Sequence, residues 1–425
     1  MIEADFTAAP PPAPPPDRLS VDVCVVGAGP VGATLACRLA AAGLTVAVID
    51  RAALPPMEHP AFDGRAYAIA AGTVPLLQEA GLWEHLPQKP APIRDIRVTD
   101  GRVGRAASRL FLHFDHRAAA DPGAEAPPFG WMIEARSLRV ALNAALHARP
   151  GLHVFAPAEA RVERHAEGAR VRIAGGPEIA CRLVVAAEGR QSPLREAAGI
   201  AVTHLPYDQT GIVCAIRHEK PHHATALEHF LPGGPFAQLP MGASEDAEDG
   251  GAAHVSAIVW TERTPVARAL LGLDAPRFAR EIARRLGPHL GEIRVVGRRW
   301  SYPLSAMIVH RYTDTRLVLV GDAAHGIHPI AGQGLNLGFR DVACLSALLM
   351  DAAGGDAGDP ALLAAYQRAR RPDNLLMLGM TDGLDRLFST DRRPVRMVRD
   401  LGLGAVQRLP GLKRMFMRRA MGLAR

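Results

Sequence analysis

The residues at the start of the chain best suited to chemistry are three glycines spaced Gly-x-Gly-x-x-Gly, at positions 27, 29 and 32. They follow the apolar, β-branched run at 21–26 and precede a helical pattern. In this arrangement Gly27 allows a tight turn, Gly29 lets the backbone approach a pyrophosphate, and Gly32 lets helix and strand pack closely. A second apolar run ends at Asp50, whose carboxylate can accept a hydrogen bond from a ribose hydroxyl. The spacing therefore predicts a strand–helix–strand unit that binds a nucleotide.

A second group of candidate residues lies within 316–341, which reads RLVLVGDAAHGIHPIAGQGLNLGFRD. An apolar run typical of a buried parallel strand ends at Gly321 and Asp322, and Gly332-Gln333-Gly334 leads into a helical pattern. The acid suits the hydroxyl groups of a bound cofactor, and the helix start offers free N–H groups and a partial positive charge. This combination suits a flavin, whose ring gains negative charge near N1 on reduction. A strand, turn and helix without a ligand is the alternative, and the nucleotide motif upstream favours the flavin.

Charged residues near these motifs extend the candidate site. The turn EGRQSPLR at 188–195 follows another buried parallel-type run. Arg65 precedes a helical pattern at 74–80, and its guanidinium has the donor geometry that a pyrophosphate needs, although a surface position is the alternative. Arg51 follows the ribose-binding acid, and Arg136 stands near the start of a further helical segment.

The order of these elements predicts an α/β protein with two interleaved domains. The glycine motifs belong to a Rossmann-like, three-layer nucleotide-binding domain with a parallel sheet. Alternating apolar and polar residues in the middle of the chain predict a mostly antiparallel sheet that covers the substrate, interrupted by one helix at 276–286. Short strands near 152–155, 160–164 and 170–173 are expected to form an antiparallel ribbon. We expect a disordered Pro-rich extension at 1–17, a nucleotide-binding domain at 18–80, 128–202 and 304–372, a substrate domain at 81–127 and 203–303, and a C-terminal helical basic tail at 373–425.

Charge and cysteine usage narrow the function classes. Residues 391–425 carry ten basic and two acidic residues, a balance of +8, so the rest of the chain sums to −2 of the total +6. A basic tail on an acidic body argues against nucleic acid as the partner. The five cysteines stand singly, without the spacing of a metal site, which predicts free buried thiols and no metal. The start of the chain does not read as a signal peptide, and no apolar run of about 18 residues predicts a membrane span.

Three separated signatures carry a resemblance to a known family. GAGPVG at 27–32, EGRQSPLR at 188–195 and GDAAH…PIAGQGLNLG at 321–338 together resemble the single-component (group A) flavoprotein monooxygenases with the para-hydroxybenzoate hydroxylase fold. FLPGGPFAQLP at 230–240, HPIAGQGLNLGFRDV at 328–342 and DNLLMLGMTDGLDRLFS at 373–389 resemble more narrowly the ubiquinone-biosynthesis hydroxylases of the UbiH/UbiF/VisC type. One motif departs from the pattern, because the family usually has Asp-Gly where this chain has Glu188-Gly189. The extra methylene predicts a shifted or water-bridged contact, with FAD binding still expected.

The resemblance implies an FAD-dependent monooxygenase that hydroxylates a polyprenylated phenol intermediate of ubiquinone biosynthesis. In that family reduced FAD and oxygen form a flavin C4a hydroperoxide, and NAD(P)H is the expected transient electron donor. Such chemistry needs an apolar pocket between the antiparallel sheet and the flavin. A hydroxylase of a soluble phenolic compound and a flavin-binding scaffold of a membrane-associated quinone-biosynthesis complex stay open as alternatives. The residues assigned to the cofactor are Gly27, Gly29, Pro30, Gly32, Asp50, Arg51, Arg65, Arg136, Glu188, Gly189, Gly321, Asp322, Gly332, Gln333, Gly334, Leu335 and Asn336.

No acid–base residue is assigned from the sequence. His328 and Pro329 lie where the family's loop runs close to the flavin ring, and Tyr302 follows a predicted strand. A histidine that bonds loop backbone and an aromatic that only packs are the alternatives.

The basic tail at 391–425 has several interpretations. The apolar residues that recur there at helical spacing are Leu412, Met415, Phe416, Ala420 and Leu423, with arginines opposite. A solvated basic helix is one reading; contact with a membrane surface, or with an acidic partner in a quinone-biosynthesis complex, is the other. The expected location is cytoplasmic, with peripheral contact at the inner face of the cytoplasmic membrane.

Overall fold

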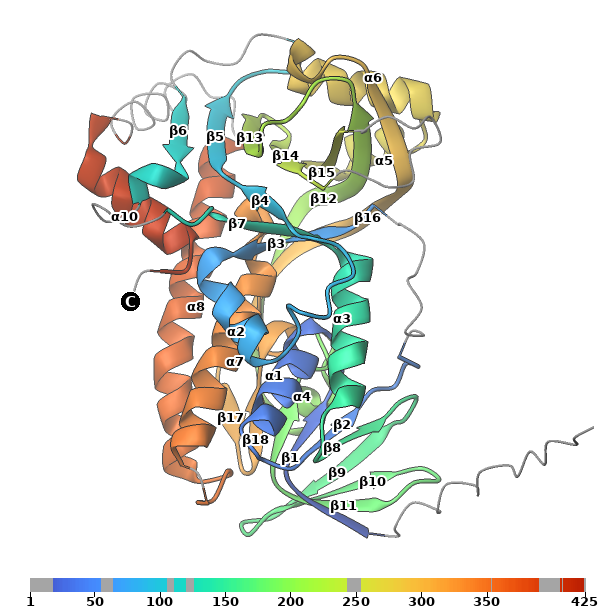
Figure 1. Ribbon diagram of the computed structural model, residues 1–425, viewed down its shortest axis with the longest axis vertical. Helices are drawn as coiled ribbons and strands as arrows, with labels where there is room; N and C mark the ends of the chain where they lie inside the picture. Colours follow the sequence, from blue (N-terminus) through green and yellow to red (C-terminus); the bar gives the residue numbers. More distant parts are fainter. Residues whose placement is uncertain are drawn as a thin grey trace, which may run out of the picture.

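The computed structural model describes residues 18–54, 64–104, 111–119, 126–242, 254–352, 354–389, 406 and 408–423. The extension predicted at 1–17 and the first part of the basic tail lie outside these residues. Within them, two large sheets sit at opposite ends of an elongated molecule (Figure 1). The predicted α/β class, with one parallel and one antiparallel sheet, is confirmed.

The first sheet is built on consecutive buried apolar residues, as expected for parallel strands covered on both faces. Its parallel strands run in the order β18-β11-β1-β2-β8, and short antiparallel strands flank them. The strand at 152–155 had been expected in an antiparallel ribbon, but it pairs in parallel with β2. The strands are β1 (Arg18–Val26), β2 (Val46–Ile49), β8 (Leu152–Phe155), β9 (Ala160–Arg164), β10 (Ala169–Ile173), β11 (Glu178–Ala186), β17 (Thr313–Asp314) and β18 (Leu317–Leu319).

Helices line up beside this sheet. The first helix packs between α3 and α7, and α7 packs against the long α8 (Figure 1). Their buried faces join one apolar core with the strands. The helices are α1 (Pro30–Ala41), α2 (Val74–Glu79), α3 (Ala135–Ala148), α4 (Pro193–Ala197), α7 (Gly334–Asp351) and α8 (Pro360–Phe388).

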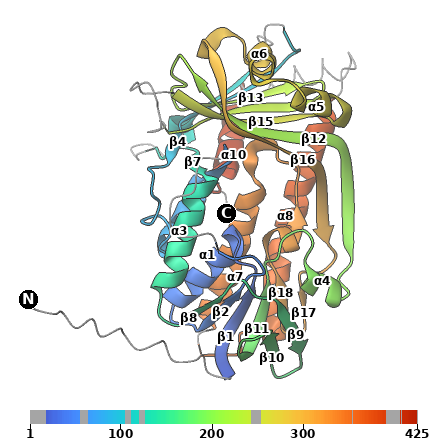
Figure 2. The ribbon, with the colours of Figure 1, turned by 90° about the vertical axis from the view of Figure 1, so that its right-hand side faces the viewer.

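The second sheet forms a broad layer over the helices (Figure 2). Its order is β19-β16-β12-β15-β14-β13-β5-β6, antiparallel except where β13 pairs with β5. Helices α5 (Thr264–Leu271) and α6 (Ala275–Leu286) cover one side around the buried Trp260. The sequence predicted α6 and missed α5. The strands are β5 (Asp95–Asp100), β6 (Leu112–Asp115), β12 (Val202–His218), β13 (Thr225–Leu231), β14 (Gly234–Pro240), β15 (His254–Arg263), β16 (Ile293–Val309) and β19 (His325–Gly326).

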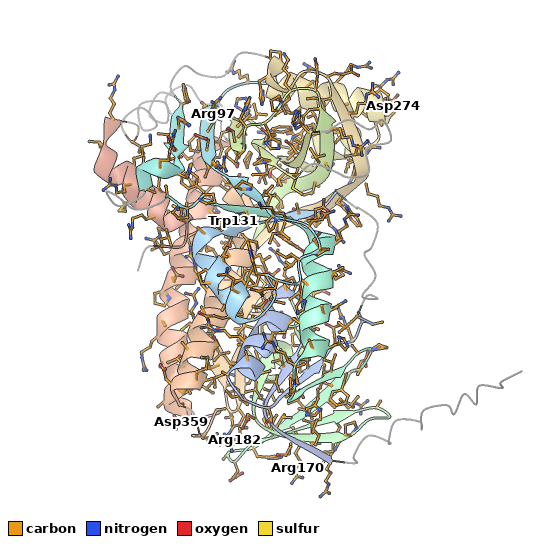
Figure 3. The ribbon with its side chains drawn as sticks, viewed as in Figure 1. Arg97, Trp131, Arg170, Arg182, Asp274 and Asp359 are labelled. Atoms are coloured by element: carbon orange, nitrogen blue, oxygen red, sulfur yellow. The ribbon has the colours of Figure 1, made fainter. Side chains whose placement is uncertain are left out.

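A three-stranded sheet lies at the junction of the two larger sheets. It consists of β3 (Ala66–Ala70), β7 (Gly130–Glu134) and β4 (Ala91–Ile93). Figure 3 shows Trp131 of β7 at this junction, with Arg97 at the antiparallel end and Arg182 at the parallel end of the molecule.

Two of the expected domain boundaries fall inside continuous elements. Strand β16 runs through the boundary near 303, whereas β12 begins at the boundary near 202, and these two strands of 17 residues each pair over most of their lengths. Helix α8 continues through Pro372, past the expected start of the tail at 373. The ends of the long strands therefore tie the antiparallel sheet to the nucleotide-binding core.

Candidate active site

The first glycine motif forms a cradle at the start of α1. Gly27 has φ +109°, and a Cβ there would lie 2.4 Å from the carbonyl oxygen of Ala187. A Cβ on Gly32 would lie 2.0 Å from the carbonyl oxygen of Gly27, so helix and turn pack too closely for any side chain. At Gly29 a Cβ would meet no atom within 4 Å. This glycine borders open space beside the uncapped helix start, where a pyrophosphate fits.

Asp50 holds the neighbouring loop. Its Oδ2 accepts a hydrogen bond from the Ala28 amide at 2.7 Å, and its Oδ1 accepts one from the Ala52 amide at 2.8 Å. A carboxylate has about four lone-pair sites, so each oxygen keeps capacity for a ribose hydroxyl. The exposed Arg51 follows it.

Glu188 is drawn into its own turn. Its Oε2 accepts hydrogen bonds from Ser192 Oγ at 2.5 Å and from the Leu194 amide at 3.2 Å. Burial raises the pKa of Glu188, although these hydrogen bonds and the charges of Arg51 and Arg195 oppose the rise. The Glu188 side chain thus bonds to the start of α4. The shifted or water-bridged contact with the cofactor stays a prediction. Gly189 has φ +85° and open space at its Cβ position.

Two arginines of the same turn reach the 321–323 turn. Arg190 Nε lies 3.4 Å from Asp322 Oδ2, and Arg195 Nη1 donates to the carbonyl oxygen of Ala323 at 3.1 Å. Asp322 keeps 54% of its side chain exposed, so it is available to a ligand. A Cβ on Gly321, at φ +58°, would touch Val31 of α1 at 3.1 Å. The structure therefore brings the three sequence motifs to one place.

The start of α7 completes this place. Gly332 is exposed at φ +60°, and a Cβ on Gly334 would meet no atom within 4 Å. The helix has no side-chain cap, and its first N–H groups are suited to a flavin's negative edge. Gln333 and Leu335 are half-buried on either side.

Asn336 has a structural partner. Its Oδ1 accepts from the Ala70 amide and its Nδ2 donates to the Ala68 carbonyl oxygen, each at 2.9 Å. The side chain fastens β3 to α7, and any contact of this residue with a cofactor is left to its backbone.

Two predicted arginines make contacts elsewhere. The Arg65 guanidinium lies 4.4 Å from the centroid of the Trp300 ring on β16. Arg136 Nε donates to Glu134 Oε2 at 2.5 Å in a nearly buried pair. The pyrophosphate role of Arg65 and the cofactor-binding role of Arg136 stay predictions.

A cavity of about 830 Å³ lies between the antiparallel sheet and the loop at 329–333. Its walls come from that sheet, the β3–β7–β4 sheet, α8 and α10 (Pro410–Ala420), and most of its lining side chains are aliphatic or aromatic. Among the described residues that line it, the ionisable ones are Glu228 and Arg419. An apolar pocket stands where the sequence predicted one.

The three acid–base candidates differ in position. Pro329 lines the cavity, whereas His328 and Tyr302 are not among its lining residues. His328 is fully buried, and its Nε2 lies 3.2 Å from Gln209 Oε1. Burial lowers the pKa of His328, against the charges of Asp385 and Asp382. Tyr302 keeps 41% of its surface exposed on β16.

Two carboxylates escaped the sequence interpretation. Asp341 lies buried beneath the 321–323 turn, where His325 Nε2 is 2.5 Å from its Oδ2. Glu228 faces the cavity from β13, between Ala226 and Phe230. Because alternate strand residues share a face, a charge between two apolar neighbours at that spacing was a signal for an inward carboxyl.

Comparison with known proteins defines the class. The family model described as an FAD binding domain matches residues 20–377. The solved structure of p-nitrophenol 4-monooxygenase PnpA from Pseudomonas putida DLL-E4 superposes with a TM-score of 0.72 at 17% sequence identity, covering 95% of this chain and 98% of that one. The chain has the fold of the FAD-dependent monooxygenases and belongs to that class.

The most informative relatives narrow this class. The chain is 48% identical to the ubiquinone hydroxylase UbiL of Rhodospirillum rubrum, covering 94% of this chain and 89% of the relative. It is 32% identical to the 3-demethoxyubiquinol 3-hydroxylase of Escherichia coli K12, covering 95% and 98%. The chain belongs to the family of FAD-dependent ubiquinone-biosynthesis hydroxylases, as the motifs indicated.

Proposed function

We propose that the protein hydroxylates the aromatic ring of a polyprenylated phenol in ubiquinone biosynthesis. The observation that carries this is the apolar cavity of about 830 Å³ that opens beside the glycine loop at 329–333. A drug-sized ligand fills a pocket of roughly 300–1,000 Å³, so the cavity accommodates a ring together with part of a prenyl chain. The printed names of the two relatives, a ubiquinone hydroxylase and a demethoxyubiquinol hydroxylase, support the same substrate class.

The residues of the chain divide the work. The turn at Gly27–Gly32 and Asp50 bind the adenosine side of FAD, Asp322 binds the ribityl chain, and the start of α7 faces the pyrimidine edge of the ring. When bound and reduced by the transient donor NAD(P)H, FAD would activate molecular oxygen, one atom of which goes to the ring and the other to water. The apolar walls orient the substrate and exclude water, which limits wasteful decay of the reactive species.

Gene deletion followed by mass spectrometry of quinone precursors tests this proposal. We expect the quinone to be lost and a precursor lacking one ring oxygen to accumulate, with its mass and fragmentation naming the ring position. Complementation with the intact gene is the control. An unchanged quinone profile would refute the proposal.

The cavity also bears on the alternatives. A small soluble phenol would leave most of the apolar wall unfilled, which disfavours that substrate class. A flavin-binding scaffold without turnover would keep the open space at Gly29 and Gly334 for its cofactor, but it would not need an apolar cavity beside that space.

We also propose that α10 contacts the membrane surface. Helix α10 packs on the body through Met417 and Met421, which were not in the apolar stripe expected from the sequence. The outward apolar residues are Leu409, Met415 and Leu423, each at least 38% exposed. Basic residues accompany them, namely Arg408, Lys413, Arg414 and Arg418.

This arrangement suits an anionic lipid surface, since apolar side chains insert while arginines meet the headgroups. No helix in the described part of the chain is long and apolar enough to cross a bilayer. Because α10 also walls the cavity, contact there would bring a bilayer-borne substrate to its site.

Vesicle flotation tests the membrane contact. The full chain should float with vesicles containing anionic lipid, and a variant with Leu409, Met415 and Leu423 all changed to Ser should not. Val266→Ser is the matched control, because Val266 is an exposed apolar residue on α5, which lies across the same end of the molecule from α10 (Figure 1). Equal flotation of all three proteins would reject the contact.

A further inference from the structure

Glu228 is the one carboxyl among the described residues that line the cavity. It lies on β13 opposite Ala237 of β14 and Val98 of β5, with Phe230 two positions along on the same face. All four of these residues line the cavity. The accessible part of Glu228 therefore faces an apolar chamber, and no hydrogen bond or ion pair is found for its carboxyl within the described chain.

The charged surroundings of Glu228 are sparse. The adjacent strands β5, β6, β14 and β15 contribute apolar side chains and Thr261 to the cavity, and α8 and the loop at 329–333 contribute no charge. Helix α10 contributes Arg419, the other ionisable lining residue. Burial alone raises the pKa of Glu228 to about 7, with no contribution from Arg419.

A lone carboxyl in an apolar wall destabilises the fold unless something is gained by it, because burying an unpaired polar group is unfavourable. The neighbouring lining residues show that an apolar side chain fits this surface. The missing partner is therefore to be sought in what enters the cavity. A phenol brings one hydroxyl group, which is a hydrogen-bond donor, into an otherwise apolar volume.

We propose that Glu228 binds the ring hydroxyl of the phenolic substrate, accepting its hydrogen bond and so orienting the ring in the cavity. This rests on the proposed function and deepens it, since it selects phenols over ring ethers of the same shape. The ionised carboxylate only accepts, so it prefers the hydroxyl. The protonated acid can also donate to an ether oxygen, which weakens that preference. When the phenol hydroxyl donates to the carboxylate, the phenol oxygen gains negative charge and releases electron density into the ring. The ring then reacts more readily with an electrophilic oxygen.

The test compares para-pentylphenol with its methyl ether as probes of the purified holoprotein, by equilibrium dialysis. At pH 8 the wild type should bind the phenol about tenfold more tightly, the factor that a charge-assisted hydrogen bond of about 1.4 kcal/mol supplies. The preference should fall as the pH drops through 7. The ratio of the two affinities should be near one in Glu228→Leu at every pH. In Glu228→Gln this ratio should no longer depend on pH.

Thr261→Val is the matched control, because Thr261 lines the same cavity and Val keeps its shape. This variant should keep the wild-type preference. If Thr261→Val lost the preference for the phenol while Glu228→Leu kept it, the role of Glu228 would be overturned, but a phenol site would remain. Failure of the wild type to bind either probe would overturn the inference together with the proposed apolar substrate site.

Discussion

Two carboxyls lie near the glycine loops: Asp341 is buried beneath them, and Glu228 is half-buried in the wall of the cavity. Asp341 is fully buried and accepts hydrogen bonds from the Gly321 amide at 2.9 Å and from Arg370 Nε at 2.8 Å. Burial pushes the pKa of Asp341 up, but His325 and Arg370 outweigh it, so the pKa is lowered. Among the residues that the structure describes, Glu228 has no such partners, and its pKa is raised to about 7 by burial.

The difference in hydrogen-bond partners separates a carboxyl that stabilises the fold from one that is available to a ligand. Asp341 of α7 joins the turn after β18 to α8, because it bonds both Gly321 and Arg370. Arg370 also donates to Asn374, whose amide donates to Tyr312, so the network extends further. The bonds of Asp341 are complete within the protein, and it fixes the shape of the flavin loop. Glu228 keeps its hydrogen-bonding capacity for a ligand. Buried charge alone therefore says little about function until its partners are known.

The largest effect is expected for Asp341→Asn. The change leaves Arg370 buried opposite a neutral amide, and breaking a buried pair in this way costs about 3–5 kcal/mol of unfolding free energy. Denaturant unfolding measures the loss. Asp373→Asn is the control, because Asp373 also pairs with Arg370 but is 25% exposed, and it should cost no more than about 1 kcal/mol. Similar losses in both variants would contradict the contrast.

Glu228→Gln is expected to raise the unfolding free energy at high pH, whereas Asp341→Asn lowers it. The pKa of Glu228 is about 7 in the folded protein and about 4.3 in the unfolded chain. The carboxyl therefore does not reduce the unfolding free energy below pH 4.3, and it reduces this free energy as the pH rises from there through 7. Glutamine resembles the protonated acid, so the variant should match the wild type near pH 4. At pH 8 it should be more stable by up to about 3 kcal/mol.

Unfolding free energies at both pH values measure this crossover. Glu167→Gln, at an exposed position in a turn, should show no difference at either pH. A pH-independent effect of Glu228→Gln would mean that its carboxyl has a partner in the folded protein.

The smallest effect on stability, with a specific effect on the cofactor, is expected for Asp322→Ala. Asp322 is exposed and faces only Arg190 at 3.4 Å, so its loss should change the unfolding free energy by less than about 1 kcal/mol. The ribityl contact should be lost, and FAD should dissociate during gel filtration. Asp351→Ala, an exposed acid at the end of α7, should stay yellow. A fully yellow Asp322→Ala protein would remove this residue from the site.

Particular elements show how far the sequence led. Gly27 and Gly32 were assigned to a tight turn and to helix–strand packing from their spacing, and in the structure no side chain fits at either position. Helix α5 was missed because its eight residues are too short for a clear helical period. The strand at 152–155 was misassigned because its pairing with β2 depends on a partner about a hundred positions away. Met417 and Met421 were left out of the tail's apolar stripe because only docking on the β3–β7–β4 sheet reveals which side of α10 is buried.

The amino-acid sequence by itself determined the parallel and antiparallel sheets, the three cofactor motifs, the family and the apolar character of the substrate pocket. These follow from local spacing and from residue types that have few conformational alternatives. Only the tertiary structure decided which carboxyls have partners. Hydrogen bonds such as those of Asp341 to His325 and Arg370 join residues from separate elements, and the isolation of Glu228 depends on every wall of the cavity at once.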